Sequence, residues 1–318
     1  MPTISVVTPC YNAGAFIEET MASVRAQKGI EWEHIVVDDG SSDDSAARVA
    51  AIASTDPRVV LVEQENSGVH VARSTGAERA DPSSRYLMFL DADDYLAPNC
   101  LSTLVDHLEA NPAVGLVYCA WTLVEQDGSP VDQAPGFAPR YVRHGLRIRE
   151  LAPNDPDTPL DALVSRHEAI PSTAVLRRSV FDRTKGWRRF GVVEDKDMVL
   201  QMALLAPVHF LPQRLSYYRR ADTSRSQEQF YESMDQLHSA WWDDHTLDPT
   251  QLRAVRKAIV FDRRVSATTS GRAALRQLRE RRFRDGAELG ARAIKRFGEA
   301  AVLSLKASIG ARRSGHGR

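Results

Sequence analysis

The sequence lacks any long apolar segment. No apolar run among its 318 residues approaches the roughly 20 residues that a membrane-spanning helix requires. Its start, residues 1–7, also lacks the basic flank and the extended apolar stretch of a secretory signal peptide. These two absences predict a protein that is cytoplasmic and has no membrane-spanning helix.

Cysteine is scarce as well. The three cysteines, Cys10, Cys100 and Cys119, are far apart and odd in number. Their spacing matches no metal-binding motif, and it argues against a disulfide framework. We therefore expect three reduced thiols.

A glycine-rich phosphate loop is missing after the first predicted strand, residues 4–8. The segment that follows, Pro9-Cys-Tyr-Asn-Ala-Gly14, has one glycine and no lysine. A dinucleotide-dependent dehydrogenase is excluded, because it would carry the G-x-G-x-x-G pattern at this place. A sugar nucleotidyltransferase has a similar parallel sheet but normally carries a glycine-rich loop with a basic residue. It stays an alternative.

The net charge of −1 hides two regions of opposite sign. Residues 251–318 hold 18 Lys/Arg and 5 Asp/Glu, a balance of +13, whereas residues 1–250 hold 23 and 37, a balance of −14. This asymmetry indicates different roles for the acidic part and the basic tail. We predict a catalytic domain over residues 1–226 and a basic helical region with a disordered end over residues 227–318.

Apolar residues recur at helical spacing near the end of the tail, with basic residues between them: Ile294, Phe297, Ala301 and Leu305. A basic amphipathic helix can lie on an anionic membrane surface, which would place the protein at the inner face of the membrane. The alternative is a helix that packs on the domain and exposes its arginines, and the sequence leaves both open. Nucleic-acid binding is disfavoured, because no aromatic stacking platform or known motif is present.

Short apolar runs alternate with helical patterns in the first half of the chain. The predicted strands cover residues 4–8, 34–38, 59–62 and 86–90, and a helix over residues 16–26 follows the first. Strands separated by helices favour a mostly parallel sheet that is covered on both faces. Such sheets bind ligands beyond the carboxyl ends of their strands. The polar segments 9–12, 38–40 and 91–93 are therefore predicted to converge at one edge.

The second half is predicted to contain further strands and one longer helix. Residues 128–160 are rich in proline, glycine and arginine, and they are predicted to form a long loop or a short hairpin. The other predicted elements are strands over 115–125, 172–176, 209–211 and 215–219, and a helix over 194–205.

Three acidic residues follow the fourth predicted strand, in the tetrapeptide Asp91-Ala-Asp93-Asp94. If extended geometry continued, Asp91 and Asp93 would share one face. Two carboxylates ~4 Å apart repel by roughly 4 kcal/mol at an effective dielectric of about 20. Mg²⁺ or Mn²⁺ would relieve this repulsion, because hard cations bind carboxylate oxygens together with substrate phosphates. The alternative is a solvated acidic turn that caps the helix beginning near Asn99.

Six short motifs follow one another along the chain. They are Ser5-Val-Val-Thr-Pro-Cys-Tyr-Asn-Ala-Gly14, Val36-Val-Asp-Asp-Gly-Ser-Ser-Asp43, Asn66-Ser-Gly68 with Ala72-Arg73, Leu90-Asp-Ala-Asp-Asp94, Gly186-Trp187 with Glu194-Asp195, and Tyr217-Tyr-Arg-Arg220. Their order and spacing resemble those of the family 2 glycosyltransferases over residues 3–226. The resemblance implies an α/β fold of the GT-A (Rossmann-like) type, a mostly parallel central sheet flanked by helices, here with a C-terminal helical extension.

The resemblance also implies inverting transfer of one sugar from a nucleoside diphosphate donor, with UDP-sugars expected, to an acceptor hydroxyl. The acceptor would be a saccharide, a glycolipid or a small molecule. By position in the motifs, Pro9, Tyr11 and Asp39 would hold the nucleotide base. Arg73 would lie near the nucleotide and diphosphate, and Asp91 would approach the ribose. Asp39 as a helix cap and Arg73 as a surface arginine are the structural alternatives.

The resemblance assigns the metal and the base to different segments. Asp93 would bind Mn²⁺ or Mg²⁺ beside the diphosphate. Asp195 would be the general base, and Glu194 would orient it or assist the acceptor. Inverting displacement needs such a base on the side of the sugar opposite the leaving group. The structural alternative for the Glu194-Asp195 pair is a helix cap with a favourable dipole interaction.

The chain departs from the family pattern in several places. Arg73-Ser74 stands where relatives usually have Arg-Asn. Residues 221–222 replace a histidine in a loop near the diphosphate, and Arg219, Arg220 or Arg225 would have to substitute for it. The absence of a Gln-x-x-Arg-Trp segment disfavours a processive polymer synthase. A catalytically degenerate sugar-nucleotide-binding module stays the non-enzyme alternative.

Overall fold

The computed structural model describes residues 1–131, 141–144, 147–150, 160, 163, 169–220 and 227–263. The chain divides into two compact units. Unit 1 comprises residues 1–139, 153–158 and 168–234, and unit 2 comprises residues 140–152, 159–167 and 235–318. The predicted domain boundary after residue 226 stays a prediction. The predicted amphipathic helix at residues 294–305 lies outside the described residues.

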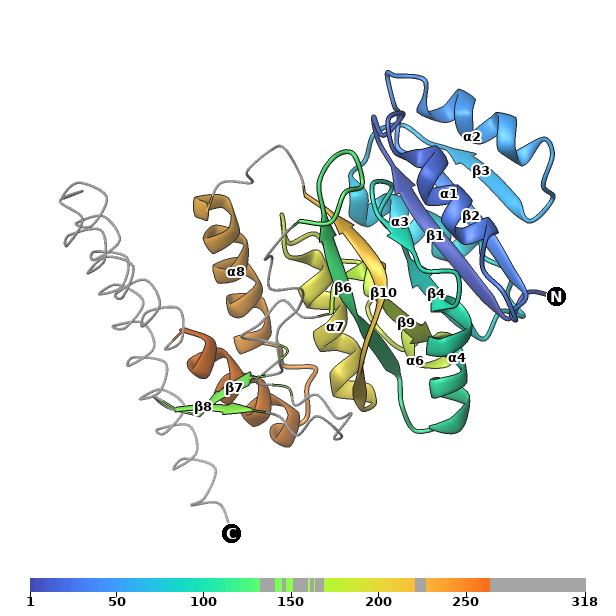
Figure 1. Cartoon of the computed structure of the whole chain (residues 1–318). Helices are drawn as coiled ribbons and strands as arrows, with labels where there is room; N and C mark the ends of the chain where they lie inside the picture. Colours follow the sequence, from blue (N-terminus) through green and yellow to red (C-terminus); the bar gives the residue numbers. More distant parts are fainter. Residues whose placement is uncertain are drawn as a thin grey trace, which may run out of the picture. The chain divides into compact units, whose positions relative to one another are not determined.

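Unit 1 is built on an eight-stranded sheet of order β3-β2-β1-β4-β9-β6-β10-β5 (Figure 1). The strands are β1 (Ile4–Cys10), β2 (Trp32–Asp38), β3 (Val59–Glu63), β4 (Tyr86–Phe89), β5 (Tyr95–Leu96), β6 (Leu116–Val124), β9 (Ala174–Arg177) and β10 (Val208–Arg219). The helices are α1 (Ile17–Arg25), α2 (Ser45–Ala53), α3 (Val69–Arg79), α4 (Cys100–Ala110), α6 (Arg178–Phe181) and α7 (Glu194–Leu205), with a 3-10 turn, η1 (Pro171–Thr173), before β9.

In unit 2, β7 (Tyr141–His144) and β8 (Arg147–Glu150) form a separate hairpin, within the segment predicted to be a long loop or a short hairpin. Residues 249–263 are helical. A further helix, α8 (Gln227–Trp242), begins in unit 1 and ends in unit 2. None of the helices in the described part of the chain is long and apolar enough to span a bilayer.

The predicted α/β class is confirmed, with a mixed sheet. The pairs β3–β2, β2–β1, β1–β4 and β6–β10 are parallel. β9 is antiparallel to both β4 and β6, and β5 is antiparallel to β10. β10 is one strand where the sequence predicted two, because register shifts between Leu211 and Ser216 interrupt its alternation without ending its pairing with β6.

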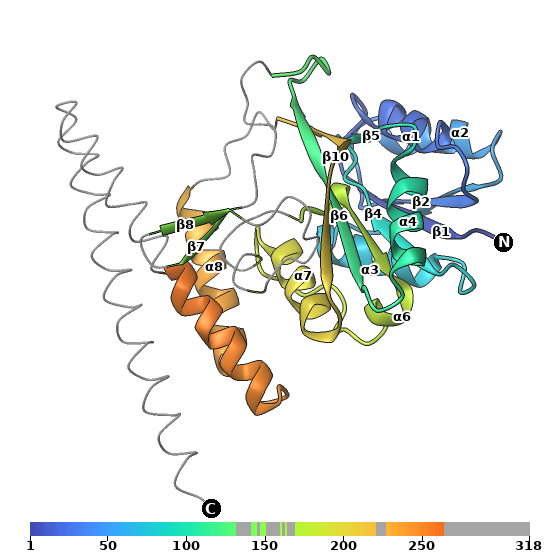
Figure 2. The ribbon, with the colours of Figure 1, turned by 60° about the horizontal axis from the view of Figure 1, so that its bottom comes forward.

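The sheet is covered on both faces, as expected for parallel strands that alternate with helices. Figures 1 and 2 show α1 and α4 on one face and α3, α6 and α7 on the other. Ile4, Val6 and Val36 join the apolar core with α1, α2 and α4. On the opposite face, a Cβ atom added to Gly76 of α3 would lie 2.2 Å from Val7 Cγ1, so a glycine is required for this close packing.

Pro9 marks the place where the sheet opens. β1 pairs with β4 as far as Val7 and Phe89, and the last bond runs from Leu90 N to Val7 O at 2.9 Å. Continuing this register would place Pro9 opposite Asp91, but proline has no N–H to donate. The next bond, from the N of Pro9 to Leu90 O, cannot form, and the pairing stops there. On the other side of the strand, Asp91 N donates to Ser172 Oγ at 3.1 Å.

The acidic tetrapeptide is therefore a turn. Asp94 N donates to Asp91 O at 3.1 Å, so the extended geometry expected for Asp91 and Asp93 is wrong. The N-cap residue of α4 is Asn99, with no side-chain hydrogen bond at the cap. The acidic turn thus exists, but its proposed role as a helix cap does not fit.

His34 is a buried histidine in β2. Its Nε2 lies 2.8 Å from Thr8 Oγ1, and burial lowers the pKa of His34 to about 3. The imidazolium form would lose its hydration there. The unfolded pKa is about 6.5, so the unfolded chain binds more protons than the folded chain at low pH. The stability that depends on neutral His34 is therefore fully present above about pH 6.5. It falls as the pH drops from about 6.5 toward 3, the pKa of His34 in the folded protein.

We expect His34 alone to lower the free energy of unfolding by about 1.4 kcal/mol between about pH 7.5 and 5.5. The double variant Thr8→Val/His34→Leu removes both polar partners together, which avoids an unpaired buried group. Urea denaturation of both proteins across this range measures the difference. If the free energy of unfolding falls by the same amount in wild type and in the double variant over this pH range, His34 does not titrate as its burial implies.

Candidate active site

The polar ends of β1, β2 and β4 meet at one edge of the sheet, as predicted. Pro9 and Cys10 pair with Val37 and Asp38 at the ends of β1 and β2. The strand β4 ends beside β1 and leads directly into Asp91. The pairing register therefore brings together the three segments predicted to converge.

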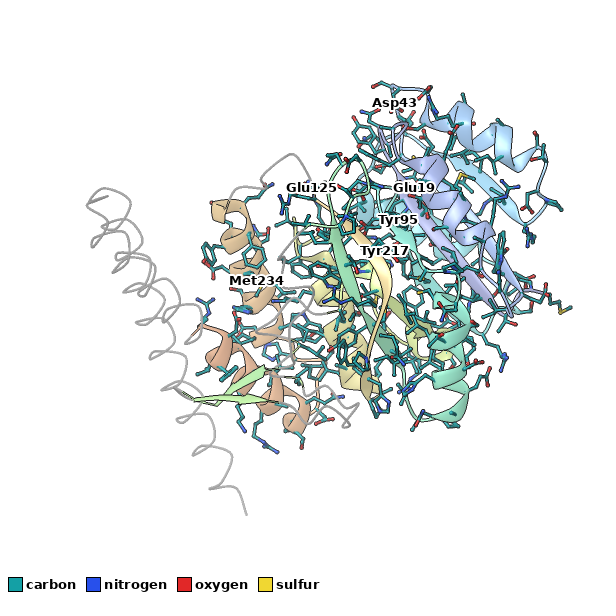
Figure 3. The ribbon with its side chains drawn as sticks, in the orientation of Figure 1. Glu19, Asp43, Tyr95, Glu125, Tyr217 and Met234 are labelled. Carbon is teal, nitrogen blue, oxygen red and sulfur yellow. The ribbon has the colours of Figure 1, made fainter. Side chains whose placement is uncertain are left out.

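The loops that follow β1 and β2 are bonded to each other. Gly14 N donates to Asp43 Oδ2 at 2.9 Å, and Ser42 N donates to Asn12 Oδ1 at 2.8 Å. Asn12 has a left-handed φ of 50°, and a Cβ on Gly14 would lie 2.3 Å from Asp44 Oδ1. Figure 3 labels Asp43 beside these loops. The two loops thus form one rigid wall.

Asp39 and Tyr11, two predicted base-binding residues, differ in exposure. Tyr11 is an exposed aromatic residue on the wall, whereas Asp39 is buried. The Asp39 carboxylate accepts from Gln64 Nε2 at 2.7 Å, Ser67 N at 2.8 Å and Gly68 N at 2.9 Å, so it fixes the start of α3. α2 begins well after Asp39, so the alternative role as a cap of that helix does not fit. Contact with the base stays a prediction.

Arg73 lies inside the site, so the alternative of a surface arginine is wrong. Its side chain is 5% exposed. Nη2 donates to Asp91 Oδ1 at 2.7 Å, and Nη1 lies 3.9 Å from Glu194 Oε1. The guanidinium carbon lies 4.6 Å from the ring centroid of Trp187, which packs edge-on against Phe89. The Gly186-Trp187 motif thus supplies an aromatic face for this buried cation.

The charges around Arg73 determine its ionisation. Burial alone would lower the pKa of the guanidinium, but Asp91, Glu194 and Asp195 outweigh burial, and the pKa is raised. Two predicted site segments about a hundred residues apart therefore meet at one permanently charged side chain.

The acidic turn concentrates negative charge. Burial, together with the charges of Asp93 and Asp91, raises the pKa of Asp94 well above its ordinary value. Asp94 Oδ1 accepts from Arg219 N at 2.9 Å, while Asp91 and Asp93 are partly exposed. Asp94 is thus buried and bound to the backbone of β10, which fits a supporting role rather than direct contact with a ligand.

The donor set of this turn fits a divalent cation of the Mg²⁺ or Mn²⁺ kind. Within the described ranges, no group of three or more His, Cys, Asp or Glu residues is placed to hold a metal ion. Such ions often bind through one or two carboxylates and complete their coordination with substrate phosphates and water. Asp93, with Asp91 beside it, can supply the one or two carboxylate ligands. The metal role of Asp93 stays a prediction.

The start of α7 carries three acidic residues, Glu194, Asp195 and Asp197, in its first turn. Asp197 is buried and paired with Arg188, and Glu194 is buried near Arg73. Asp195 is the most exposed of the three. Acidic residues here interact favourably with the helix dipole. The N-cap residue, Val193, makes no side-chain bond, but Asp195 Oδ1 accepts from Lys196 N at 2.7 Å, so the structural alternative also fits Asp195. Asp195 is thus the most accessible of the three to a ligand from solvent, and its role as base stays a prediction.

The arginines of Tyr217-Tyr-Arg-Arg220 were predicted to substitute for a histidine near the diphosphate, and the structure limits this role. Arg219 is 2% exposed and donates to Glu19, so it does not fit the role of a phosphate ligand. Arg220 is exposed and pairs with Glu125 at 2.9 Å. Arg225 lies outside the described residues. The motif was visible in the sequence, but the burial of its first arginine was not.

Comparison with known sequences identifies the chain's relatives. The family model described as glycosyl transferase family 2 matches residues 5–184. The uncharacterized protein MT1568 of Mycobacterium tuberculosis is 31% identical over 274 residues, which cover 81% of this chain and 80% of the relative. The putative teichuronic acid biosynthesis glycosyltransferase TuaG of Bacillus subtilis is 37% identical over 133 residues, 42% of this chain and 52% of TuaG.

Solved structures of S. aureus TarS share the fold. TarS 1–349 has a TM-score of 0.61 at 18% identity, and the match covers 82% of this chain and 70% of that chain. The same protein in complex with UDP-GlcNAc has a TM-score of 0.62 at 14% identity, covering 91% and 90%. At these identities, the likeness shows the fold alone.

Replacing Arg73 by alanine should leave Asp91 and Glu194 without their buried cation. We expect Arg73→Ala to lower the free energy of unfolding by about 3 kcal/mol, the lower end of the range for a broken buried pair, because Asp91 is 30% exposed. Arg85→Ala is the matched control, since Arg85 is 61% exposed and pairs with Glu109 at 2.6 Å. That change should cost about 1 kcal/mol or less. Equal losses in urea denaturation would contradict the buried role of Arg73.

Proposed function

Because this chain belongs to glycosyl transferase family 2, we propose that it transfers one sugar from a UDP-sugar to an acceptor hydroxyl, with inversion and with a divalent metal ion. One observation carries the proposal. Arg73 lies against both Asp91, after β4, and Glu194, at the start of α7. This contact supports a single site that contains the predicted donor-side and acceptor-side carboxylates.

The donor class is supported by the fold and by the wall that follows β1 and β2. S. aureus TarS, which has the same fold, has been solved with UDP-GlcNAc and with UDP. In this chain, Tyr11 offers an exposed aromatic face on which a uracil ring can stack. Asp39 accepts three internal N–H groups, and we propose that the imide of the base adds one more donor at this carboxylate.

The acceptor class is a saccharide or glycolipid of the cell envelope. Relatives are named for teichuronic acid biosynthesis in Bacillus subtilis and for O-antigen biosynthesis in Myxococcus xanthus. Contact with an anionic membrane belongs to the same proposal, and it rests on the balance of +13 over residues 251–318.

The reaction is a single displacement at the anomeric carbon. The acceptor oxygen forms a bond to this carbon while the bond to the diphosphate oxygen breaks, and UDP leaves with the bonding electrons. Asp195 takes the proton of the acceptor hydroxyl. Glu194, held near Arg73, orients the first turn of α7. Asp93, with Asp91 beside it, would hold the divalent cation, which, when bound, neutralises charge on the leaving diphosphate.

Removing the metal ligand should remove metal-dependent donor binding. We expect Asp93→Asn to weaken Mn²⁺-dependent UDP binding by at least about tenfold, or about 1.4 kcal/mol, while the fold survives. Titration calorimetry with UDP, with and without Mn²⁺, measures the effect. Asp106→Asn, at an exposed carboxylate of α4, is the control and should bind as wild type. Unchanged Mn²⁺-dependent binding by Asp93→Asn would remove Asp93 from the metal site.

Removing the base should affect turnover rather than donor affinity. We expect Asp195→Asn to lower turnover by about 10²-fold or more, the scale of a lost general base. UDP affinity should stay nearly unchanged, because Asp195 acts on the acceptor. Sugar transfer from UDP-GlcNAc, UDP-glucose and UDP-galactose to saccharide acceptors measures turnover, with Asp182→Asn on the exposed end of α6 as control. Near-normal turnover would move the role to Glu194. Wild-type protein that binds UDP but neither transfers nor hydrolyses any donor would favour the degenerate binding module.

A further inference from the structure

Arg219 is a buried cation at the end of β10 that the proposed reaction does not use directly. Its Nε donates to the carbonyl oxygen of Asp93 at 2.9 Å. Its Nη1 donates to the carbonyl oxygens of Glu125 at 3.1 Å and Gln126 at 2.5 Å. Its Nη2 donates to Glu19 Oε2 at 2.5 Å. One side chain therefore joins β10 to α1, to the end of β6 and to the acidic turn.

The acidic turn is fixed to β10 at consecutive residues. Besides the contact with Asp93, the backbone N of Arg219 donates to Asp94 Oδ1 at 2.9 Å. Tyr95 follows, and it pairs with Tyr217 in the ladder between β5 and β10. Their rings stack with centroids 4.5 Å apart and an interplanar angle of 9°. Figure 3 shows these two labelled side chains together.

We propose that Arg219 is a positioning residue for the Asp93 carboxylate, an inference that rests on the proposed metal-dependent function. Asp93 lies in a turn, where no strand pairing fixes its backbone. The guanidinium contacts the carbonyl oxygen of Asp93, so this bond orients the backbone without occupying the carboxylate. Mutation of groups that orient a metal ligand typically lowers metal affinity by about 10- to 100-fold.

Glu19 completes the arrangement by balancing the charge of Arg219. The guanidinium lies 4.9 Å from the ring centroid of Phe16 and 5.6 Å from that of Tyr95, so it is held between aromatic faces close to the turn. An uncompensated cation at this place would repel a divalent metal ion bound at Asp93. The carboxylate of Glu19, about half exposed, pairs with the guanidinium and reduces that repulsion.

Mn²⁺ binding by the full-length protein at saturating UDP tests this role. Free Mn²⁺ is measured by electron paramagnetic resonance, and metal-free UDP affinity is measured by calorimetry. Arg219→Lys keeps the charge but loses the planar fork. We expect Mn²⁺ affinity to fall by at least about tenfold, while metal-free UDP affinity changes less than about twofold. Arg85→Lys is the same substitution at an exposed arginine that pairs with Glu109, away from the proposed site, and it should leave both affinities unchanged.

Each outcome decides the inference. Mn²⁺ affinity of Arg219→Lys equal to wild type would overturn it and leave the proposed function intact. A parallel loss of Mn²⁺ and metal-free UDP affinity would also overturn it, since a purely structural role predicts that result. If circular dichroism shows that Arg219→Lys does not fold, Glu19→Gln decides, with an expected loss of at least about threefold in Mn²⁺ affinity and no change as the overturning result. Wild-type protein without Mn²⁺-dependent UDP binding would overturn the inference and the metal proposal together.

Discussion

Two buried guanidinium groups hold the carboxylate-rich edge of the sheet together. Carboxylates about 4 Å apart repel by roughly 4 kcal/mol at an effective dielectric of about 20, so Asp91, Asp93 and Asp94 need nearby compensation. Arg73 supplies charge compensation by pairing with Asp91. Arg219 supplies hydrogen bonds, from its backbone N to Asp94 Oδ1 and from its side chain to the carbonyl oxygen of Asp93, while Glu19 balances its own charge. The raised pKa of Asp94 shows that burial and like charges still act on the turn.

The two arginines act on different atoms, and this difference separates the two sides of the proposed site. Arg73 contacts side-chain carboxylates, so it ties Asp91 to Glu194 and the end of β4 to the start of α7. Arg219 contacts the carbonyl oxygen of Asp93, so it fixes the backbone position of Asp93 without pairing with its carboxylate. One arginine thus compensates charge between donor and acceptor sides, and the other sets geometry on the donor side alone.

Most of the sheet and the convergence of its polar ends were predictable from the sequence, because parallel strands present their carboxyl ends at one edge. The direction of β9 was not, since a short apolar run shows its periodicity but not its orientation. The continuity of β10 was not predictable either, because its bulges place exposed polar residues between two apolar runs and the sequence then resembles two strands. The burial of Arg219 could not be predicted from the sequence either, because its partners come from distant segments, α1 and the end of β6.

Pro9 explains how one edge combines a rigid wall with a separate turn. In a parallel strand, alternate residues bond to opposite neighbours, so a single missing N–H ends pairing on one side only. β1 therefore keeps its register with β2 to Cys10 and Asp38, which fixes the loops proposed to bind the nucleotide, while its pairing with β4 ends at Phe89. The turn over residues 91–94, between β4 and β5, has no strand pairing. Besides the bond from Asp94 N to Asp91 O, its geometry depends on side chains: Ser172 accepts from Asp91 N, Thr20 lies 2.8 Å from the carbonyl oxygens of Ala92 and Asp94, and Arg219 binds Asp93 and Asp94.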